Sequence, residues 1–249
     1  MPVAMPALAQ APPPAGWTIG LGFGAGWNSN PHEISTRAKG DSAFSPDISL
    51  SYRRALWEGG ALTLSVFGGS ELYGRETSAG FQRLLGTVAL SQTWQATTAT
   101  VNIVQRKALS HDFFRHDSAS TEIGVNLSRI VTLDESWSLL VFGRLARRLV
   151  GDGTEDRWRA NANVTLTYKS GAWSWRAGGG FAYALEDKTP ILPRINDRSI
   201  SARLGVAYEW DKDREIALGG SFNRTYSSYQ PNRFKSFSLQ PRVSATIRF

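Results

Sequence analysis

The sequence predicts an all-β protein, a twelve-stranded antiparallel up-and-down barrel whose strands cross a membrane. Three observations predict this fold. Apolar and polar residues alternate along segments of 11 to 14 residues, short and long connections alternate between the segments, and tryptophans gather at the segment ends. Soluble strands average about 5–6 residues, whereas a tilted membrane strand needs about 9–11. The segment length therefore favours membrane strands.

The composition excludes several other classes of protein. The chain has 249 residues, a formal net charge of +7, no cysteine and 11% aromatic residues. It is too aromatic for a disordered chain, and it can form neither disulfides nor thiolate metal sites. No run of 18 apolar residues occurs, which excludes a helical membrane protein.

The first residues have the features of an export signal. Residues 1–11 contain Ala7-Leu8-Ala9, which fits the small-x-small pattern of a signal-peptidase site. We therefore expect residues 1–11 to be the remnant of a signal that begins upstream, with a flexible Ala/Pro leader as the alternative. Residues 12–249 are expected to form a single transmembrane barrel domain.

The alternation is clearest in the last segment, where Phe237, Leu239, Val243 and Ile247 share one face and polar residues share the other. This period of two is the mark of a strand with one apolar face. Twelve such segments follow one another along the chain: 16–27, 44–57, 61–73, 83–95, 98–108, 120–133, 136–149, 157–169, 172–185, 198–210, 214–226 and 236–249.

The connections between these segments alternate in length. Tight turns near residues 58, 96, 134, 170 and 212 separate longer polar connections at 28–43, 74–82, 109–119, 150–156, 186–197 and 227–235. Bacterial outer-membrane barrels combine short periplasmic turns with longer outer loops in this way. An even number of strands also brings both chain ends to the side of the short turns.

Tryptophans mark both ends of the predicted strands. Indole rings prefer a membrane–water boundary, where they form aromatic girdles. Six lie beside the short turns and two at the opposite strand ends; in that order they are Trp17, Trp57, Trp94, Trp137, Trp173 and Trp210, then Trp27 and Trp158.

The C-terminal segment resembles the β-signal of Gram-negative outer-membrane proteins. It alternates Val243, Ala245 and Ile247 with polar residues and ends in Phe249. The resemblance implies recognition by the barrel-assembly machinery, an integral place in the outer membrane among lipid and lipopolysaccharide, and two periplasmic termini. In strand count and arginine bias, the chain is also similar to the twelve-stranded acidic-oligosaccharide porins.

If the apolar face meets lipid, the other face lines the lumen. Five carboxylates, Asp47, Glu71, Glu122, Glu209 and Glu215, fall on this face. More arginines do: Arg53, Arg75, Arg83, Arg106, Arg144, Arg148, Arg159, Arg176, Arg203, Arg242 and Arg248. A positive lumen would concentrate anionic solutes, and guanidinium groups match carboxylate and phosphate geometry.

Two interpretations of this lumen stay open. The arginines could line an anion channel, or they could pair with the carboxylates and fill the barrel, since twelve strands lie between filled and open sizes. Small residues on the same face would leave space in one sector: Gly20, Gly22, Gly24, Gly26, Gly178, Gly180, Gly205 and Gly219.

Cations also occur on the predicted lipid face. Lys107, Arg147 and Arg224 are expected near the outer end, where lipid phosphates lie. Arg54 and Arg129 fit the pattern less well, and snorkelling, bulges or an oligomer contact could accommodate them. The alternate spacing of the arginines, without a recognition helix, argues against nucleic-acid binding.

The sequence offers little catalytic chemistry. His32, His111 and His116 are all expected in outer loops, and loop 109–119 combines serine, histidine and aspartate side chains without a closed metal-ligand spacing. No phosphate loop, dinucleotide fingerprint or calcium loop is present, so we expect no cofactor, no metal and no catalytic residues.

The predicted function is therefore passive passage of small, anionic solutes. A structural or export-associated barrel that anchors an envelope protein partner, or forms a homo-oligomer, is the alternative. A rim hydrolase using loop 109–119 is the third interpretation.

Overall fold

The computed structural model describes residues 15–30, 40–75, 80–110, 116–150, 156–187, 194–211, 213–229 and 233–248. Within these ranges the chain forms twelve strands and no helix that is long and apolar enough to cross a membrane. The strands are β1 (Gly16–Asn28), β2 (Asp41–Trp57), β3 (Gly60–Tyr73), β4 (Phe81–Trp94), β5 (Thr97–Ser110), β6 (His116–Thr132), β7 (Trp137–Val150), β8 (Arg157–Ser170), β9 (Trp173–Glu186), β10 (Asn196–Asp211), β11 (Arg214–Ser227) and β12 (Phe234–Arg248).

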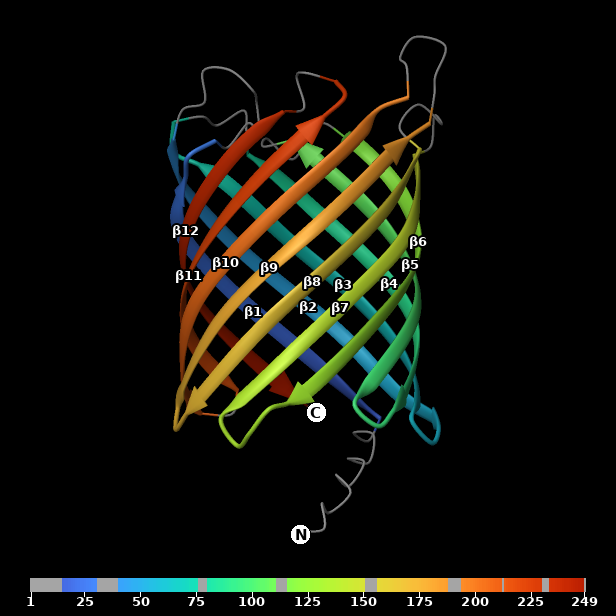
Figure 1. Ribbon diagram of the computed structural model, residues 1–249, viewed down its shortest axis with the longest axis vertical. Coiled ribbons are helices and arrows are strands. Elements are labelled where there is room, and N and C mark those ends of the chain that lie inside the picture. The colour runs from blue at the N-terminus through green and yellow to red at the C-terminus, as the bar shows by residue number, and fades with distance from the viewer. Residues whose placement is uncertain are drawn as a thin grey trace.

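The strands close into one barrel of antiparallel neighbours. Each strand pairs with the next along the chain, and β1 closes the barrel on β12, with Thr18 opposite Arg248 and Asn28 opposite Ser238. The start of β1 and the end of β12 therefore lie at the same end of the barrel, together with the short turns (Figure 1). We call this the short-turn end and the opposite one the loop end. The predicted fold class is confirmed.

Several boundaries at the loop end differ from the prediction by two to four residues, and the two largest corrections concern β2 and β6. β2 begins at Asp41 instead of residue 44, and β6 begins at His116 instead of residue 120. The expectation that every histidine lies in a loop is thus wrong for His116, whose backbone pairs with Leu109 after a bulge. Backbone hydrogen bonds continue there beyond the last apolar residue, so the side-chain pattern ends before the strand does.

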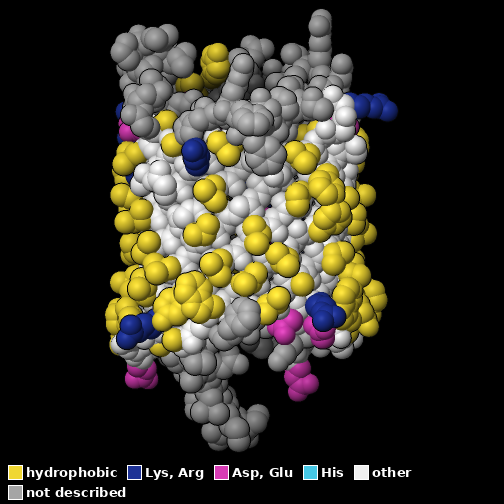
Figure 2. Space-filling view, turned by 180° about the vertical axis from the view of Figure 1, so that it is seen from behind, with side chains coloured by type: hydrophobic (Ala, Val, Ile, Leu, Met, Phe, Trp, Pro, Cys, Tyr) yellow, Lys and Arg dark blue, Asp and Glu magenta, His cyan; other side chains and the backbone are white. Residues whose placement is uncertain are grey.

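The two faces of the wall differ in character. Along β1, Trp17, Leu21 and Phe23 point outward and are 47–49% exposed, while the glycines between them point inward. On the face seen in Figure 2, apolar side chains are spread over the outer wall, and lysine and arginine side chains lie near its two ends. An apolar outer face and a polar inner one reverse the arrangement of a soluble barrel.

Two-residue turns join several strands at the short-turn end. Gly59, Gln95 and Gly171 have positive φ values of 70°, 52° and 58° in these turns. Gln95 and Gly171 are the first central residues of their turns, where a positive φ fits the type II′ turn whose twist matches that of a hairpin. Gly59 is the second central residue of its turn, and glycine adopts a positive φ there without strain. At Gln95 a residue other than glycine adopts the positive φ.

Burial on the inner face is uneven. Ala61, Ala146 and Ala207 are at most 3% exposed, yet Arg176 and Arg242 on the same inner face expose more than two fifths of their side chains. Water therefore reaches these inner side chains, and the inner wall is the candidate functional surface.

Candidate functional site

The strand register places the predicted lumen arginines on the inner face. Nine of the eleven lie within strands and have described side chains at the same alternation as the buried or polar inner residues: Arg53, Arg83, Arg106, Arg144, Arg148, Arg159, Arg176, Arg203 and Arg242. Arg75 lies just beyond β3 at the loop end, where its main-chain N–H donates to Oδ2 of Asp41 at 2.6 Å. Arg248 ends β12, and its side chain lies outside the described residues.

Carboxylates neutralise part of this positive charge. The described residues form six interior ion pairs: Arg144 and Arg159 with Glu122, Arg157 with Glu186, Lys169 with Glu209, Arg176 with Glu215, and Arg242 with Asp47. Each joins strands that are neighbours or next but one in the barrel. None of these six crosses to the opposite wall, so the pairs run along the wall and leave the axis free.

Small residues let the long pairs lie flat. Arg242 passes from β12 over Gly22 of β1 to β2, and a Cβ at Gly22 would lie 2.1 Å from its Nη2 atom. Arg176 lies opposite Gly205 and reaches Glu215 at 3.5 Å, while Arg159 lies opposite Ala146. The inward glycines thus make room for arginine side chains at the wall.

The wall formed by β5–β8 carries the densest charge. Glu122 is 5% exposed and accepts a hydrogen bond from Arg144, and one of its oxygens lies 3.6 Å from Arg159. The positive charges of Arg106, Arg144 and Arg157 all act on Arg159. One buried carboxylate therefore holds together a group of arginines that would otherwise repel one another.

Other inner arginines have no carboxylate among the described residues. These are Arg53, Arg83, Arg106 and Arg203. The guanidinium of Arg83 lies 5.2 Å from the ring centre of Phe67, which also points inward from β3. Arginines that hold no carboxylate keep their donors for water or for an anion.

A hydrogen-bond cluster ties the strand ends together at the loop end. Asn28 donates to Tyr73 at 3.2 Å, and Tyr73 donates in turn to Glu71. Asp41 accepts from the main-chain N–H groups of Ser42 and Arg75. These buried groups stabilise the mouth formed by β1, β2 and β3.

The predicted girdle tryptophans all lie on the outer wall, each 38–50% exposed. Trp17, Trp57, Trp94, Trp137, Trp173 and Trp210 lie at the short-turn end, and Trp27 and Trp158 at the loop end. Trp137, Tyr168, Trp175, Trp173 and Tyr208 form a row with ring centres 4.8, 5.4, 6.2 and 4.9 Å apart.

One outward arginine at the loop end is already neutralised. Arg147 donates to Asp187, lies 3.6 Å from Asp156 and packs over Trp158. The hydrogen bond from Arg147 lowers the pKa of the Asp187 carboxyl, and the charge of Arg194 lowers it further. Arg147 is therefore a structural cation, unlike Lys107 and Arg224, for which no carboxylate partner occurs among the described residues.

Four residues of the inner face and the aromatic row were not among the residues predicted from the sequence. Arg157, Lys169 and Glu186 face the lumen at the ends of their strands, and the ninth tryptophan, Trp175, joins the aromatic row. All four follow the same alternation as their neighbours, which could have identified them. Residues 1–11, His111 and Phe249 lie outside the described residues, and so do the side chains of Ser110 and His116.

The arrangement of possible metal ligands can be checked only in the part of the chain that the structure describes. No group of three or more histidine, cysteine, aspartate or glutamate side chains is arranged there to hold an ion. The side chains of Arg176 and Arg242 on the inner wall are 47% and 44% exposed, so their charges can attract and orient an anion from solution.

Comparison with solved structures identifies the same architecture. The chain is 11% identical to an outer membrane channel from Pseudomonas putida F1, with a TM-score of 0.61 over 97% of this chain and 99% of that one. The NanC porin is 11% identical, with a TM-score of 0.51 over 90% and 98% of the two chains. The KdgM porin is 7% identical, with a TM-score of 0.50 over 91% and 98%.

Sequence comparison alone finds no relative. No protein-family model matches the chain, and no curated protein matches it. At identities of this level the likeness extends to the fold. The chain has the twelve-stranded barrel of these porins, as its resemblance to the outer-membrane β-barrel superfamily implied.

Proposed function

We propose that the protein is a passive channel for small anionic solutes in the outer membrane of a Gram-negative bacterium, with its arginines as the selectivity lining. The observation that carries the proposal is the course of the interior ion pairs. They follow the wall, and the side chains of Arg176 and Arg242 remain 47% and 44% exposed beside their carboxylates. The fold shared with an outer membrane channel supports the same conclusion.

The charge balance of the lumen supports preference for anions. Arg83, Arg106 and Arg203 add positive charge without a carboxylate among the described residues. A positive field in a narrow aqueous passage raises the local concentration of anions and lowers that of cations. Several guanidinium groups along one wall can hand a carboxylate or phosphate from one to the next.

The outer wall supports the membrane location. Its apolar side chains and its tryptophans at both ends suit a lipid phase bounded by two interfaces. In this arrangement the short turns and both termini are periplasmic, and the longer connections face outward. We further propose that residues 1–11 are an export-signal remnant, and that Val243, Ala245, Ile247 and Phe249 form the signal read by the barrel-assembly machinery.

The test is the current through the refolded protein in a planar bilayer under a potassium chloride gradient. The wild-type barrel should show steady conductance and a reversal potential that favours chloride. Changing Arg83, Arg106, Arg144 and Arg176 to Gln should shift that potential toward potassium. The variant Arg54→Gln with Arg129→Gln, which removes cations from the outer wall, should leave it unchanged.

A second variant separates lumen charge from lumen structure. Arg83→Gln with Arg203→Gln removes charges that hold no carboxylate, so no interior ion pair is broken. It should weaken chloride preference while the protein keeps its heat-dependent shift in gel mobility. An unchanged reversal potential in both variants would contradict the proposal, and a folded but silent barrel would favour the scaffold function.

A further inference from the structure

The loop end of β10–β12 carries a second charged feature, on the outer wall. Arg198, Arg224 and Lys235 come from three adjacent strands and point outward beside Tyr226. Arg198 and Lys235 are exposed, and Arg224 packs 4.5 Å from the centre of the Tyr226 ring. No carboxylate in the described part of the chain pairs with any of the three. We call these three side chains the rim cations.

The pairing register of β10–β12 brings the three positive charges close together, which destabilises the sheet unless an anion binds there. Arg224 lies directly opposite Lys235 in the β11–β12 pair, and Arg198 lies opposite Tyr226, two residues from Arg224. Like charges directly opposite each other destabilise a sheet. The connection between β11 and β12, residues 228–233, contains no aspartate or glutamate that could offset them.

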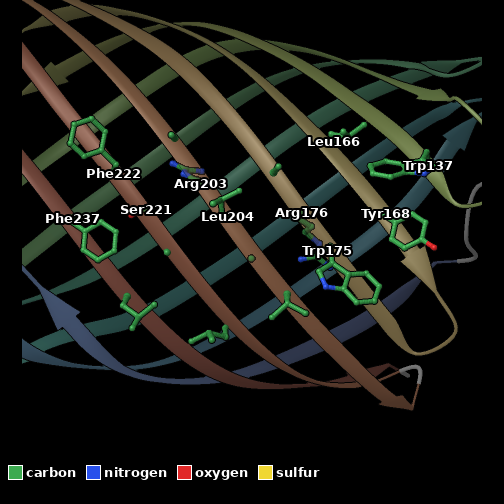
Figure 3. Close-up of a pocket in the computed structure, with 17 residues that line it drawn as sticks. Trp137, Leu166, Tyr168, Trp175, Arg176, Arg203, Leu204, Ser221, Phe222 and Phe237 are labelled. Atoms are coloured by element: carbon green, nitrogen blue, oxygen red, sulfur yellow. The ribbon is translucent and has the colours of Figure 1, made fainter.

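An apolar groove begins next to the rim cations. Its near end is formed by Phe222 and Phe237, which lie opposite each other on β11 and β12. They are the next outward-facing residues after Arg224 and Lys235 in the direction of the short-turn end. Trp137, Tyr168 and Trp175 form its far end, beside the turn between β8 and β9 (Figure 3). The groove has a volume of about 620 Å³.

Small residues create the groove. Ala177, Ala202 and Gly220 line it, and Leu204 stands 70% exposed between Ala177 and Gly220, its neighbours on the two adjoining strands. The groove crosses several tilted strands, so it follows the barrel axis and not any single strand (Figure 3). An acyl chain that stands upright in a membrane has the same direction.

We propose that this surface binds a phosphorylated, acylated glycolipid of the lipid A type, with phosphate on the rim cations and one acyl chain in the outer part of the groove. The proposal rests on the outer-membrane orientation proposed above, which brings the loop end to the glycolipid leaflet. Charge complementarity selects this occupant, because a phosphate monoester carries close to two negative charges and accepts hydrogen bonds from both arginine and lysine. Arg147 does not compete for it, since Asp187 and Asp156 already pair with that side chain.

The experiment measures retention of purified bisphosphorylated lipid A by the full-length barrel in detergent, by native mass spectrometry. The wild type should retain it, and changing Arg198, Arg224 and Lys235 to Gln should weaken retention about a hundredfold, as expected for three basic residues near an anionic lipid. Lys107→Gln removes one exposed cation from the same end of the far wall and should change retention little. Dephosphorylated lipid A should bind the wild type as weakly as lipid A binds the triple variant.

A variant of the groove tests the acyl-chain half of the site. A Cβ at Gly220 would meet no atom closer than 3.7 Å, so Gly220→Leu can fill the groove without disturbing the strand. It should weaken retention, whereas Gly86→Leu, at an open outward position on β4, should not. The heat-dependent gel shift checks that every variant has folded.

Three results would overturn the proposal: equal retention by the triple variant, an equal loss in Lys107→Gln, or equal retention of phosphatidylglycerol and lipid A. The measurement needs no current through the barrel. Lipid A retention in a silent barrel would therefore contradict only the channel function, and an anion-selective barrel without lipid A retention would contradict only the lipid site.

Discussion

Arg242 on β12 binds Asp47 on β2 across the strand on which the barrel closes. A single nitrogen, Nη2, lies 2.9 Å from Oδ1 and 2.7 Å from Oδ2 of the carboxylate, although the two residues are 195 positions apart in the chain. The strand between them is β1, which pairs with β12 on one side and β2 on the other. The ion pair thus fastens the seam between the first and last strands and neutralises one arginine of the lumen.

Gly22 is the residue that lets this pair form, and Gly22→Ala should break it. The added Cβ would lie 2.1 Å from Nη2 of Arg242 and 2.7 Å from both oxygens of Asp47, so these side chains must separate. We expect the free energy of unfolding to fall by about 1–2 kcal/mol, as for other overpacked sites. Urea unfolding of the refolded barrel in detergent, followed by tryptophan fluorescence, measures this.

The matched control is Gly219→Ala, at another inward position. Its Cβ would have only ordinary contacts, at 3.8 and 4.0 Å. Stability should stay constant or rise slightly, because alanine restricts the unfolded chain more than glycine. Equal losses in the two variants would show that Gly22 has no special relation to the ion pair.

The buried carboxylate Glu122 should matter more for stability than the exposed carboxylate Glu209. Glu122 pairs with Arg144 and Arg159, so Glu122→Gln leaves mutually repelling arginines with less compensation. We expect a loss of about 2 kcal/mol in the free energy of unfolding, as for a charged hydrogen bond, and a shift of the reversal potential toward chloride. The same urea titration and bilayer recording measure both effects.

Glu209→Gln supplies the comparison for Glu122. Its pair with Lys169 spans 3.7 Å, and the two side chains are 42% and 60% exposed. Exposed pairs contribute about 0–1 kcal/mol, so stability should change little. A loss as large as that of Glu122→Gln would mean that burial does not set the strength of these pairs.

The fold could be predicted almost completely because a membrane barrel repeats one simple rule. Most outward positions along a strand are apolar, so the alternation identified all twelve strands. The alternation failed at His116, because strand pairing continues there into a polar stretch of sequence. In such a stretch the polarity of the side chains no longer shows whether the backbone is in a strand. Hydrogen bonds between main-chain groups do not depend on which side chain is present, so no pattern of polarity marks their end.

The sequence predicts which charged side chains of the site point inward, but it does not predict which of them form ion pairs. Alternation shows that Arg176 and Glu215 point inward, yet their contact joins β9 to β11 across Gly205 and depends on how the strands are staggered around the barrel. The rim cations show the same limit. Arg198, Arg224 and Lys235 are scattered over the sequence, and only the register of β10–β12 brings them together.

The ion pair of Asp187 at the loop end should make stability depend on pH. The hydrogen bond from Arg147 lowers the pKa of this carboxyl, so the folded protein binds the proton less readily than the unfolded chain. The stabilising contribution is therefore complete above the ordinary aspartate pKa of about 3.9, and it disappears as the pH falls through the lowered pKa. Asp187→Asn should consequently destabilise the barrel at neutral pH and match the wild type in strong acid.

Unfolding curves recorded across the acidic range would test this dependence. Asp134→Asn is a useful comparison, because Asp134 caps a turn at the short-turn end by accepting hydrogen bonds from the main-chain N–H groups of Ser136 and Trp137. No arginine in the described ranges pairs with it. A difference between Asp187→Asn and wild type that stayed constant down to the lowest pH would contradict the proposed role of the Arg147–Asp187 pair.

The aromatic row at the short-turn end should lie at the membrane–water boundary. Trp137, Trp173 and Trp175 expose 38–47% of their surface on the outer wall, with Tyr168 and Tyr208 between and beside them. Indole rings at this level keep one edge in lipid and direct the N–H toward water.

In vesicles, lipids brominated near the glycerol should therefore quench tryptophan emission more than lipids brominated at the chain ends. Changing these three tryptophans to Tyr should reduce the emission that shallow bromine quenches. Stronger quenching by the deep label would place the row in the membrane interior, because bromine acts only on nearby rings, and it would contradict the boundary assigned to this end of the barrel.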